Sequence, residues 1–196
     1  MERDYGVWKF SGKEKAKLIL SYLGLCGLVS WLFYHSFWVV LPFLAGLPVF
    51  LKKSREKRIK ERREELLTEF LTGIRAIASA LDAGYSMENA LGEALKETEK
   101  VYGMDGVFTE ELREMERKRN LNQSMETLWA DLGKRSGLED IENFGEIFQV
   151  ARRSGGNLKE IIQSTADNIT RKTETRREIE ISLAAKKMEQ KVMSAV

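Results

Sequence analysis

The sequence predicts an all-α protein, with an N-terminal transmembrane helical hairpin followed by a cytoplasmic antiparallel bundle of about six helices. Three observations support this fold class. From Leu18 to Leu51, 34 consecutive residues carry no formal charge. After Pro48 the chain contains no proline, and it is rich in residues with high helix propensity. Apolar residues then recur at helical spacing through the rest of the chain.

The uncharged stretch has the length of two membrane spans. As one helix it would extend about 50 Å, against a hydrocarbon core of about 30 Å. Two spans of about 17 residues each fit better, with a break at residues 33–37 whose aromatic and polar side chains suit a membrane interface. Basic residues flank both ends of the stretch, so the positive-inside rule places both ends in the cytoplasm.

Two other interpretations of this stretch are less favourable. A cleaved signal peptide has a shorter apolar core and a small-residue cleavage site. A buried hairpin of a soluble protein would be unusual in a chain of which 32% is charged. Both prolines, Pro42 and Pro48, lie in the second predicted span, where they are tolerated if neighbouring groups satisfy the freed backbone.

Composition divides the chain into four parts. We expect a cytoplasmic N-terminal segment at residues 1–17, the hairpin at 18–51, a basic juxtamembrane segment at 52–65 and a helical domain at 66–196. Turn-forming residues divide the body into six helices. The first is expected at about residues 54–80 and the last runs from about residue 158 to the end of the chain. Trp129, Phe144 and Phe148 are expected in the core.

Two glycine-containing turns have the clearest local chemistry. Gly84 follows an apolar helical run, and its freedom to adopt positive φ predicts a left-handed helix cap. Ser86 is placed to cap the next helix. Later in the chain, Gly155 and Gly156 end a helix, and Asn157 begins the last one with a capping-box-like pattern. These residues are predicted to have structural roles.

Charge is segregated along the body. Residues 52–63 include eight basic and two acidic side chains, and residues 171–196 include seven and four. Residues 64–170 instead hold twelve basic and twenty-one acidic side chains, a net charge of −9. The juxtamembrane cluster should attract anionic membrane lipid at about 1 kcal/mol per basic residue. The acidic middle should repel phosphates, which argues against nucleic-acid binding. Ordinary solvation of helix faces explains individual charges, but not their segregation.

Within this acidic middle, Glu110, Glu111 and Glu114 are candidates for a partner-facing surface. They are consecutive or one turn apart on a predicted helix with few apolar residues. Such carboxylates would attract a basic surface on a protein partner.

Little in the sequence indicates catalysis. His35 is the single histidine and lies at the predicted outer turn, and Cys26 is the single cysteine and lies in the first span. The body therefore has neither a nucleophile–histidine pair nor a set of metal-binding thiolates. It also has no phosphate-binding loop of the Gly-x-x-x-x-Gly-Lys-Ser/Thr type. The sequence predicts a protein that is not an enzyme and has no cofactor or metal site.

The order of the motifs resembles a known family. A hairpin and basic residues lead to Leu66-Leu67-Thr68-Glu69-Phe70-Leu71, and then to an element that runs from Ala80 through Gly84-Tyr85-Ser86-Met87-Glu88 to Leu91. Ser124-Met125-Glu126-Thr127-Leu128 follows, and then Ala151-Arg152-Arg153-Ser154-Gly155-Gly156-Asn157-Leu158-Lys159-Glu160-Ile161-Ile162. This arrangement is similar to the type II secretion system F domain family. Within that family it is most similar to the TadB/TadC branch of pilus-assembly platform proteins, over residues 55–196.

The resemblance implies a function that the residues alone do not. Members are multi-pass proteins of the prokaryotic cytoplasmic membrane that form the inner platform of type II secretion systems, type IV pili and Tad pili. The implied partners are a separate secretion ATPase, pilins and other platform subunits, in a homo- or hetero-oligomer. Relatives in this branch continue into a second membrane hairpin, so residues 66–196 are expected to be truncated before it. A membrane-tethered adaptor or signalling scaffold is the alternative function.

Overall fold

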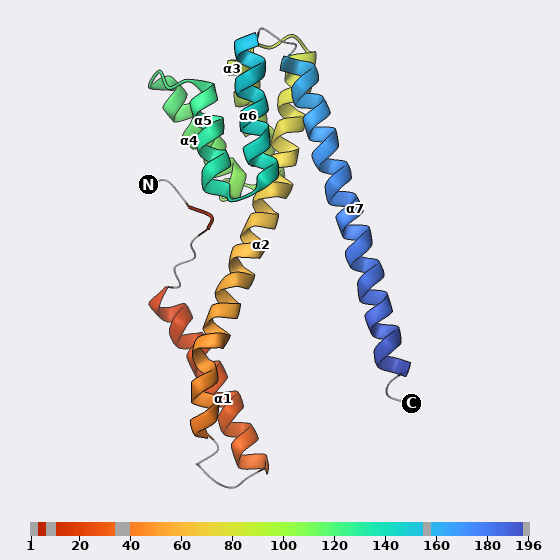
Figure 1. The fold of residues 1–196 in the computed structure, drawn as a ribbon. Helices are drawn as coiled ribbons and strands as arrows, with labels where there is room; N and C mark the ends of the chain where they lie inside the picture. The colour runs from red at the N-terminus through yellow and green to blue at the C-terminus, as the bar shows by residue number, and fades with distance from the viewer. Residues whose placement is uncertain (1–3, 7–10, 34–39, 155–157, 194–196) are drawn as a thin grey trace. The chain divides into compact units, whose positions relative to one another are not determined.

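The computed structural model describes residues 4–6, 11–33, 40–154 and 158–193, which form seven helices and no strand (Figure 1). By contacts the chain forms two compact units, Met1–Glu64 and Glu65–Val196. The all-α prediction is therefore confirmed for the described residues.

The first unit contains α1 (Gly12–Phe33) and the N-terminal part of α2 (Val40–Asp82). Helix α1 begins with a local cap, because the Ser11 N–H donates to Glu14 Oε2 at 3.0 Å. The rings of Tyr22 on α1 and Phe50 on α2 pack with their centroids 5.0 Å apart. Helix α1 is described as far as Phe33, and most of the break predicted at residues 33–37 lies outside the described residues.

No helix in the described part of the chain is long and apolar enough to cross a membrane. The transmembrane hairpin predicted for residues 18–51 is therefore not confirmed. Its expected turn overlaps residues 34–39, which lie outside the described residues.

The second unit contains the end of α2 and five further helices. These are α3 (Met87–Tyr102), α4 (Val107–Asn120), α5 (Met125–Ser136), α6 (Glu139–Ser154) and α7 (Leu158–Met193). Each boundary from the end of α2 onward falls within a few residues of the turn expected from the sequence. The start of α2 was predicted wrongly, because the helix expected from about residue 54 begins at Val40 and continues through Pro48. The prediction that the last helix belongs to the bundle holds only for its first half. Helix α7 buries Ile162, Ala166 and Ile169, but its side chains from Glu174 to Gln190 are exposed.

An aromatic cluster forms the centre of the second unit. Phe70 on α2 makes edge-to-face contacts with Phe108 on α4 and Phe144 on α6, both at 5.3 Å between centroids. Trp129 on α5 packs against Phe144 at 4.9 Å, and Phe148 lies beside both. All five rings are at most 1% exposed. Edge-to-face pairs add about 0.5–1.5 kcal/mol to the gain from burial, so this cluster fixes how four helices meet.

Helices α5 and α6 approach closely because glycines face the partner backbone. A Cβ on Gly133 of α5 would lie 2.9 Å from the Glu142 Cα, and one on Gly145 of α6 would lie 3.0 Å from the Trp129 carbonyl oxygen. No side chain can be accommodated at such distances without moving a helix. The helix pair therefore depends on both glycines.

The start of α4 is capped by a side chain from another helix. Its N-cap residue, Gly106, has no side chain to accept a hydrogen bond. The Phe108 N–H instead donates to the Glu69 carboxylate on α2 at 2.8 Å. Glu69 is only 3% exposed, so this buried carboxylate satisfies a donor that would otherwise be unpaired in the interior.

Candidate functional site: the turn cluster and the charged helix faces

The turn between α2 and α3 has the geometry predicted from the sequence. Gly84 has φ of +87°, and the Gly84 and Tyr85 N–H groups donate to the carbonyls of Leu81 and Ala80. These two hydrogen bonds define a Schellman cap. Ser86 then accepts a hydrogen bond from the Asn89 N–H at 3.3 Å as the N-cap of α3. Gly84 and Ser86 therefore occupy the C-terminal cap of α2 and the N-cap of α3.

The turn between α4 and α5 repeats this geometry, which the sequence reasoning did not anticipate. Asn122 has φ of +63°, and the Asn122 and Gln123 N–H groups donate to the carbonyls of Arg119 and Lys118. Ser124 accepts a hydrogen bond from the Thr127 N–H at 3.3 Å. A repeat in the sequence could have predicted this second cap, because Ser-Met-Glu at residues 86–88 recurs at residues 124–126.

One arginine joins the two capped helices. Arg152, in the last turn of α6, contacts Glu126 at 3.0 Å and Glu88 at 3.4 Å. The pKa of each carboxyl is lowered, chiefly by a hydrogen bond from its own backbone N–H and also by the capping serine and Arg152. The carbonyl of Glu88 additionally accepts from Arg119. The beginnings of α3 and α5 and the end of α6 are thus held together by charge.

The three glutamates proposed from the sequence as a partner-facing surface do not lie on one exposed face. Glu111 is 6% exposed and forms a two-pronged ion pair with Arg135 of α5, at 2.8 and 3.1 Å. Burial opposes the charge of Arg135, but its hydrogen bonds to Glu111 and Asp131 outweigh that effect and raise its pKa. The expectation that Glu111 is exposed was wrong, because the pattern of α4 did not reveal the ion pair that allows its burial.

Glu110 and Glu114 are half-buried on the outer side of α4. Glu114 pairs with Arg117 at 2.6 Å, and the neighbouring Arg113 pairs with Glu99 at 2.6 Å. Acidic and basic side chains therefore alternate on this face. It does not present a concentrated negative charge.

A more acidic face lies on α6. Glu139, Glu142 and Glu146 recur at intervals of three and four residues and are all exposed. Among the described residues, none of these three carboxylates forms an ion pair with a basic side chain. Val150 continues the same face and is 65% exposed. This α6 acidic face therefore combines unneutralised charge with exposed apolar surface.

Other predicted features lie elsewhere. Gly155, Gly156 and Asn157 lie outside the described residues, so the predicted turn and cap there remain predictions. No group of His, Cys, Asp and Glu side chains in the described ranges is arranged to hold a metal ion.

The family model described as type II secretion system (T2SS), protein F, matches residues 74–190, more than half of the chain. The chain belongs to the type II secretion system protein F family. The match includes both capped turns, Arg152 and the acidic face of α6. No curated protein and no solved structure matches the chain. The general resemblance drawn from the sequence is confirmed, whereas its assignment to the TadB/TadC branch is not.

The type II secretion system F domain is found in platform proteins of type II secretion and type IV pilus assembly systems. These family members are non-catalytic components of the inner membrane that work with secretion ATPases and other platform subunits. Family membership thus agrees with the general kind of function expected from the sequence.

Proposed function

We propose that this chain is a non-catalytic inner-membrane platform subunit that couples a cytoplasmic secretion ATPase to pilin movement. The family match over residues 74–190 is the observation that carries this proposal. Its machine would be a type II secretion system or a type IV or Tad pilus, and the TadB/TadC branch rests on the order of motifs alone. Its partners would be the ATPase, pilins and other platform subunits in a homo- or hetero-oligomer.

The second unit has the mechanical properties that coupling requires. A body that transmits displacement must keep its shape under load. The aromatic cluster, the close α5–α6 contact and the buried Glu111–Arg135 pair each fix the position of one helix against another. This rigidity supports a platform role for the bundle.

The membrane location rests on the uncharged stretch at residues 18–51 and on the family. If both ends of the hairpin are cytoplasmic, a cysteine introduced at Ser36, with Cys26 replaced by Ala, should react with a membrane-impermeant thiol reagent in intact cells. A cysteine at Ser164 should not react. Labelling at Ser164 in intact cells would show that the topology is wrong.

The α6 acidic face is the surface that best suits a basic region of the ATPase. Its carboxylates are exposed and unneutralised, whereas those of α4 are balanced or buried. Exposed charges at an interface act chiefly on the association rate and are screened over about 8 Å at physiological salt. Binding that depends on this face should therefore weaken as salt increases.

A charge-neutralisation experiment tests this assignment. We expect the triple variant Glu139→Gln, Glu142→Gln, Glu146→Gln to retain less of the secretion ATPase in a quantitative pull-down at low salt. The double variant Glu110→Gln, Glu114→Gln should retain more of the ATPase than the triple variant does. The matched control is Glu174→Gln, Glu178→Gln, Glu180→Gln on the exposed half of α7, which removes the same charge.

The outcomes separate three possibilities. A loss specific to the α6 variant supports the proposed contact. A larger loss in the α4 variant would place the contact on Glu110 and Glu114, as the sequence first indicated. If the wild type retains no secretion ATPase, the platform function itself is wrong and an adaptor role becomes the better interpretation.

A further inference from the structure

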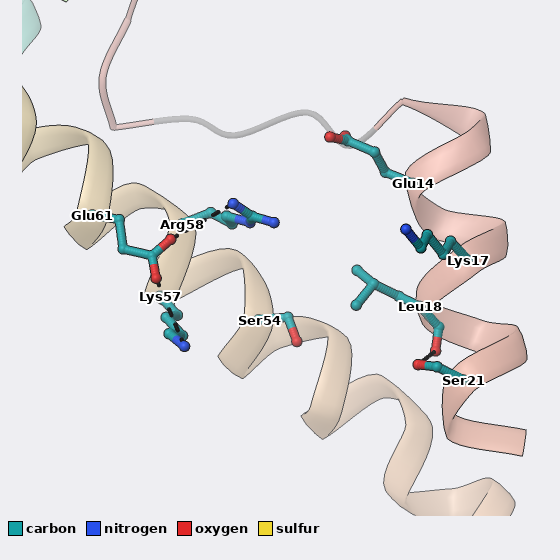
Figure 2. Close-up of a pocket in the computed structure, with 8 residues that line it drawn as sticks. All are labelled: Glu14, Lys17, Leu18, Ser21, Ser54, Lys57, Arg58 and Glu61. Atoms are coloured by element: carbon teal, nitrogen blue, oxygen red, sulfur yellow. Dashed lines mark hydrogen bonds and ion pairs between the residues drawn. The ribbon is translucent and has the colours of Figure 1, made fainter. Parts of the chain in front are cut away.

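A cleft of about 540 Å³ lies between α1 and α2 within the first unit (Figure 2). Residues of both helices line it: Glu14, Lys17, Leu18 and Ser21 from α1, and Ser54, Lys57, Arg58 and Glu61 from α2. The two helices contact each other through Tyr22 and Phe50. At the cleft, the short side chains of Ser21 and Ser54 leave space that longer ones would fill.

Cations from opposite walls face one another across this space. In Figure 2 the amine of Lys17 extends from α1 toward α2, and the guanidinium of Arg58 extends from α2 toward α1. Like charges that face each other repel unless an anion lies between them. The arrangement is therefore most favourable when a negatively charged group occupies the cleft.

The carboxylates of the cleft neutralise its cations only in part. Glu61 contacts Lys57 and Arg58 only at 3.7 and 3.8 Å, and it lies on the same helix as both. Glu14 is engaged by the Ser11 N–H at the start of α1. Within the described part of the chain, Lys17 has no carboxylate partner. Three cations against two carboxylates leave the cleft with a net positive charge.

We propose that this cleft binds a phosphate group, with Lys17 and Arg58 as the principal cationic contacts. Arginine offers a planar pair of donors that matches phosphate oxygens, and lysine adds a point charge from the opposite wall. Ser54 lies on the side of α2 that faces α1 and supplies a hydroxyl donor. The proposed site is a single cleft with named contacts. It is distinct from the general attraction of the basic juxtamembrane segment for anionic lipid.

Two sources could supply such a phosphate. One is the headgroup of an anionic phospholipid, and the other is a free phosphate. The position of the cleft favours the lipid, because the uncharged stretch of the sequence begins at Leu18, one of the lining residues. The choice of lipid rests on the proposed membrane location, whereas the phosphate site does not.

The test uses the full chain purified in an uncharged detergent. Binding of dihexanoyl phosphatidylglycerol, dihexanoyl phosphatidylcholine and inorganic phosphate is measured by titration calorimetry. We expect the variant Lys17→Ala, Arg58→Ala to bind phosphatidylglycerol at least tenfold more weakly than the wild type. The matched control, Lys15→Ala, Lys53→Ala, also removes one basic residue from each helix and should lose less than twofold.

A second variant fills the cleft without changing charge. Ser54→Leu should weaken binding to a similar degree as removal of the two cations, and circular dichroism should show unchanged helical content. If inorganic phosphate binds as tightly as phosphatidylglycerol and is lost in the same variants, the site is supported and its ligand is free phosphate. Equal losses in the cleft and control variants, or no binding of either anionic probe, would overturn the proposal. Neither result depends on whether the chain binds an ATPase.

Discussion

The α2–α3 and α4–α5 segments follow the same plan 38 residues apart, but they are stabilised differently. Residues related by this offset are equivalent in the two segments: Phe70 corresponds to Phe108, and Ser86 corresponds to Ser124. In the first segment Gly73 allows Phe108 to approach, since a Cβ there would lie 2.4 Å from the ring. In the second segment the equivalent position is Glu111, which is buried against Arg135. A shared backbone plan can thus be stabilised by close packing at one site and by a buried ion pair at another.

The largest effect should come from breaking the pair that only the second segment contains. Glu111→Ala leaves the largely buried Arg135 without its main partner, and loss of one partner from a buried pair costs about 3–5 kcal/mol. Urea denaturation followed by circular dichroism measures this loss. Glu97, which is equivalent to Arg135 in the first segment, is exposed, so Glu97→Ala should change stability by less than about 0.5 kcal/mol. Similar effects of both substitutions would contradict the comparison.

The next effect concerns the close approach in the first segment. Gly73→Ala forces the Phe108 ring to move within the aromatic cluster, and overpacking of this kind costs about 1–3 kcal/mol. Gly92→Ala on α3 is the control, because its Cβ would lie 3.5 Å from the flexible Glu116 carboxylate. That change should stabilise the helix by about 0.5–1 kcal/mol. Thermal denaturation of the two variants should give shifts of opposite sign.

The two left-handed turns offer a smaller and more direct comparison. Gly84→Ala should destabilise the protein by about 1 kcal/mol, because alanine adopts positive φ unfavourably while the site itself has space. Asn122→Gly should be neutral or slightly stabilising, since the same backbone conformation suits glycine better. If Gly84→Ala leaves the melting temperature unchanged, the turn does not require positive φ.

The smallest effect should come from the arginine that joins the two segments. Arg152 is partly exposed, so Arg152→Ala should cost about 0.2–1 kcal/mol at pH 7. Glu88 and Glu126 have lowered pKa values in the folded state, so their contribution is present above the ordinary glutamate pKa of about 4.3. It is lost as the pH falls through the lowered values. The stability difference between wild type and variant should therefore shrink below about pH 4, and a constant difference would exclude the ion pairs as its cause.

Features governed by local chemistry were predictable from the sequence. From the end of α2 onward, helix boundaries followed from glycine and capping residues, and Gly84 and Ser86 have the predicted geometry because backbone sterics act within a few residues. Proline did not mark a boundary, because Pro48 lies inside α2. The core positions of Trp129, Phe144 and Phe148 also followed from helical periodicity.

Features that depend on distant partners were not predictable. The pattern of α4 gave no indication that Arg135, 24 residues later, neutralises Glu111 and allows its burial. The acidic face of α6 was missed for a related reason. A count of charges along the sequence does not show which carboxylates are paired or buried in the fold, and the three on α6 differ from those on α4 in both respects.

The carboxylate of Glu69 has a consequence for the order in which the bundle assembles. The residue that caps α4 belongs to α2, 39 positions earlier, so it is already present when α4 is synthesised. Before α2 docks, the first turn of α4 has no capping side chain of its own and should fray. In the native protein the Phe108 amide should therefore exchange with deuterium only when α2 and α4 separate. Its exchange rate would report the opening of the whole bundle, although it lies at a helix end.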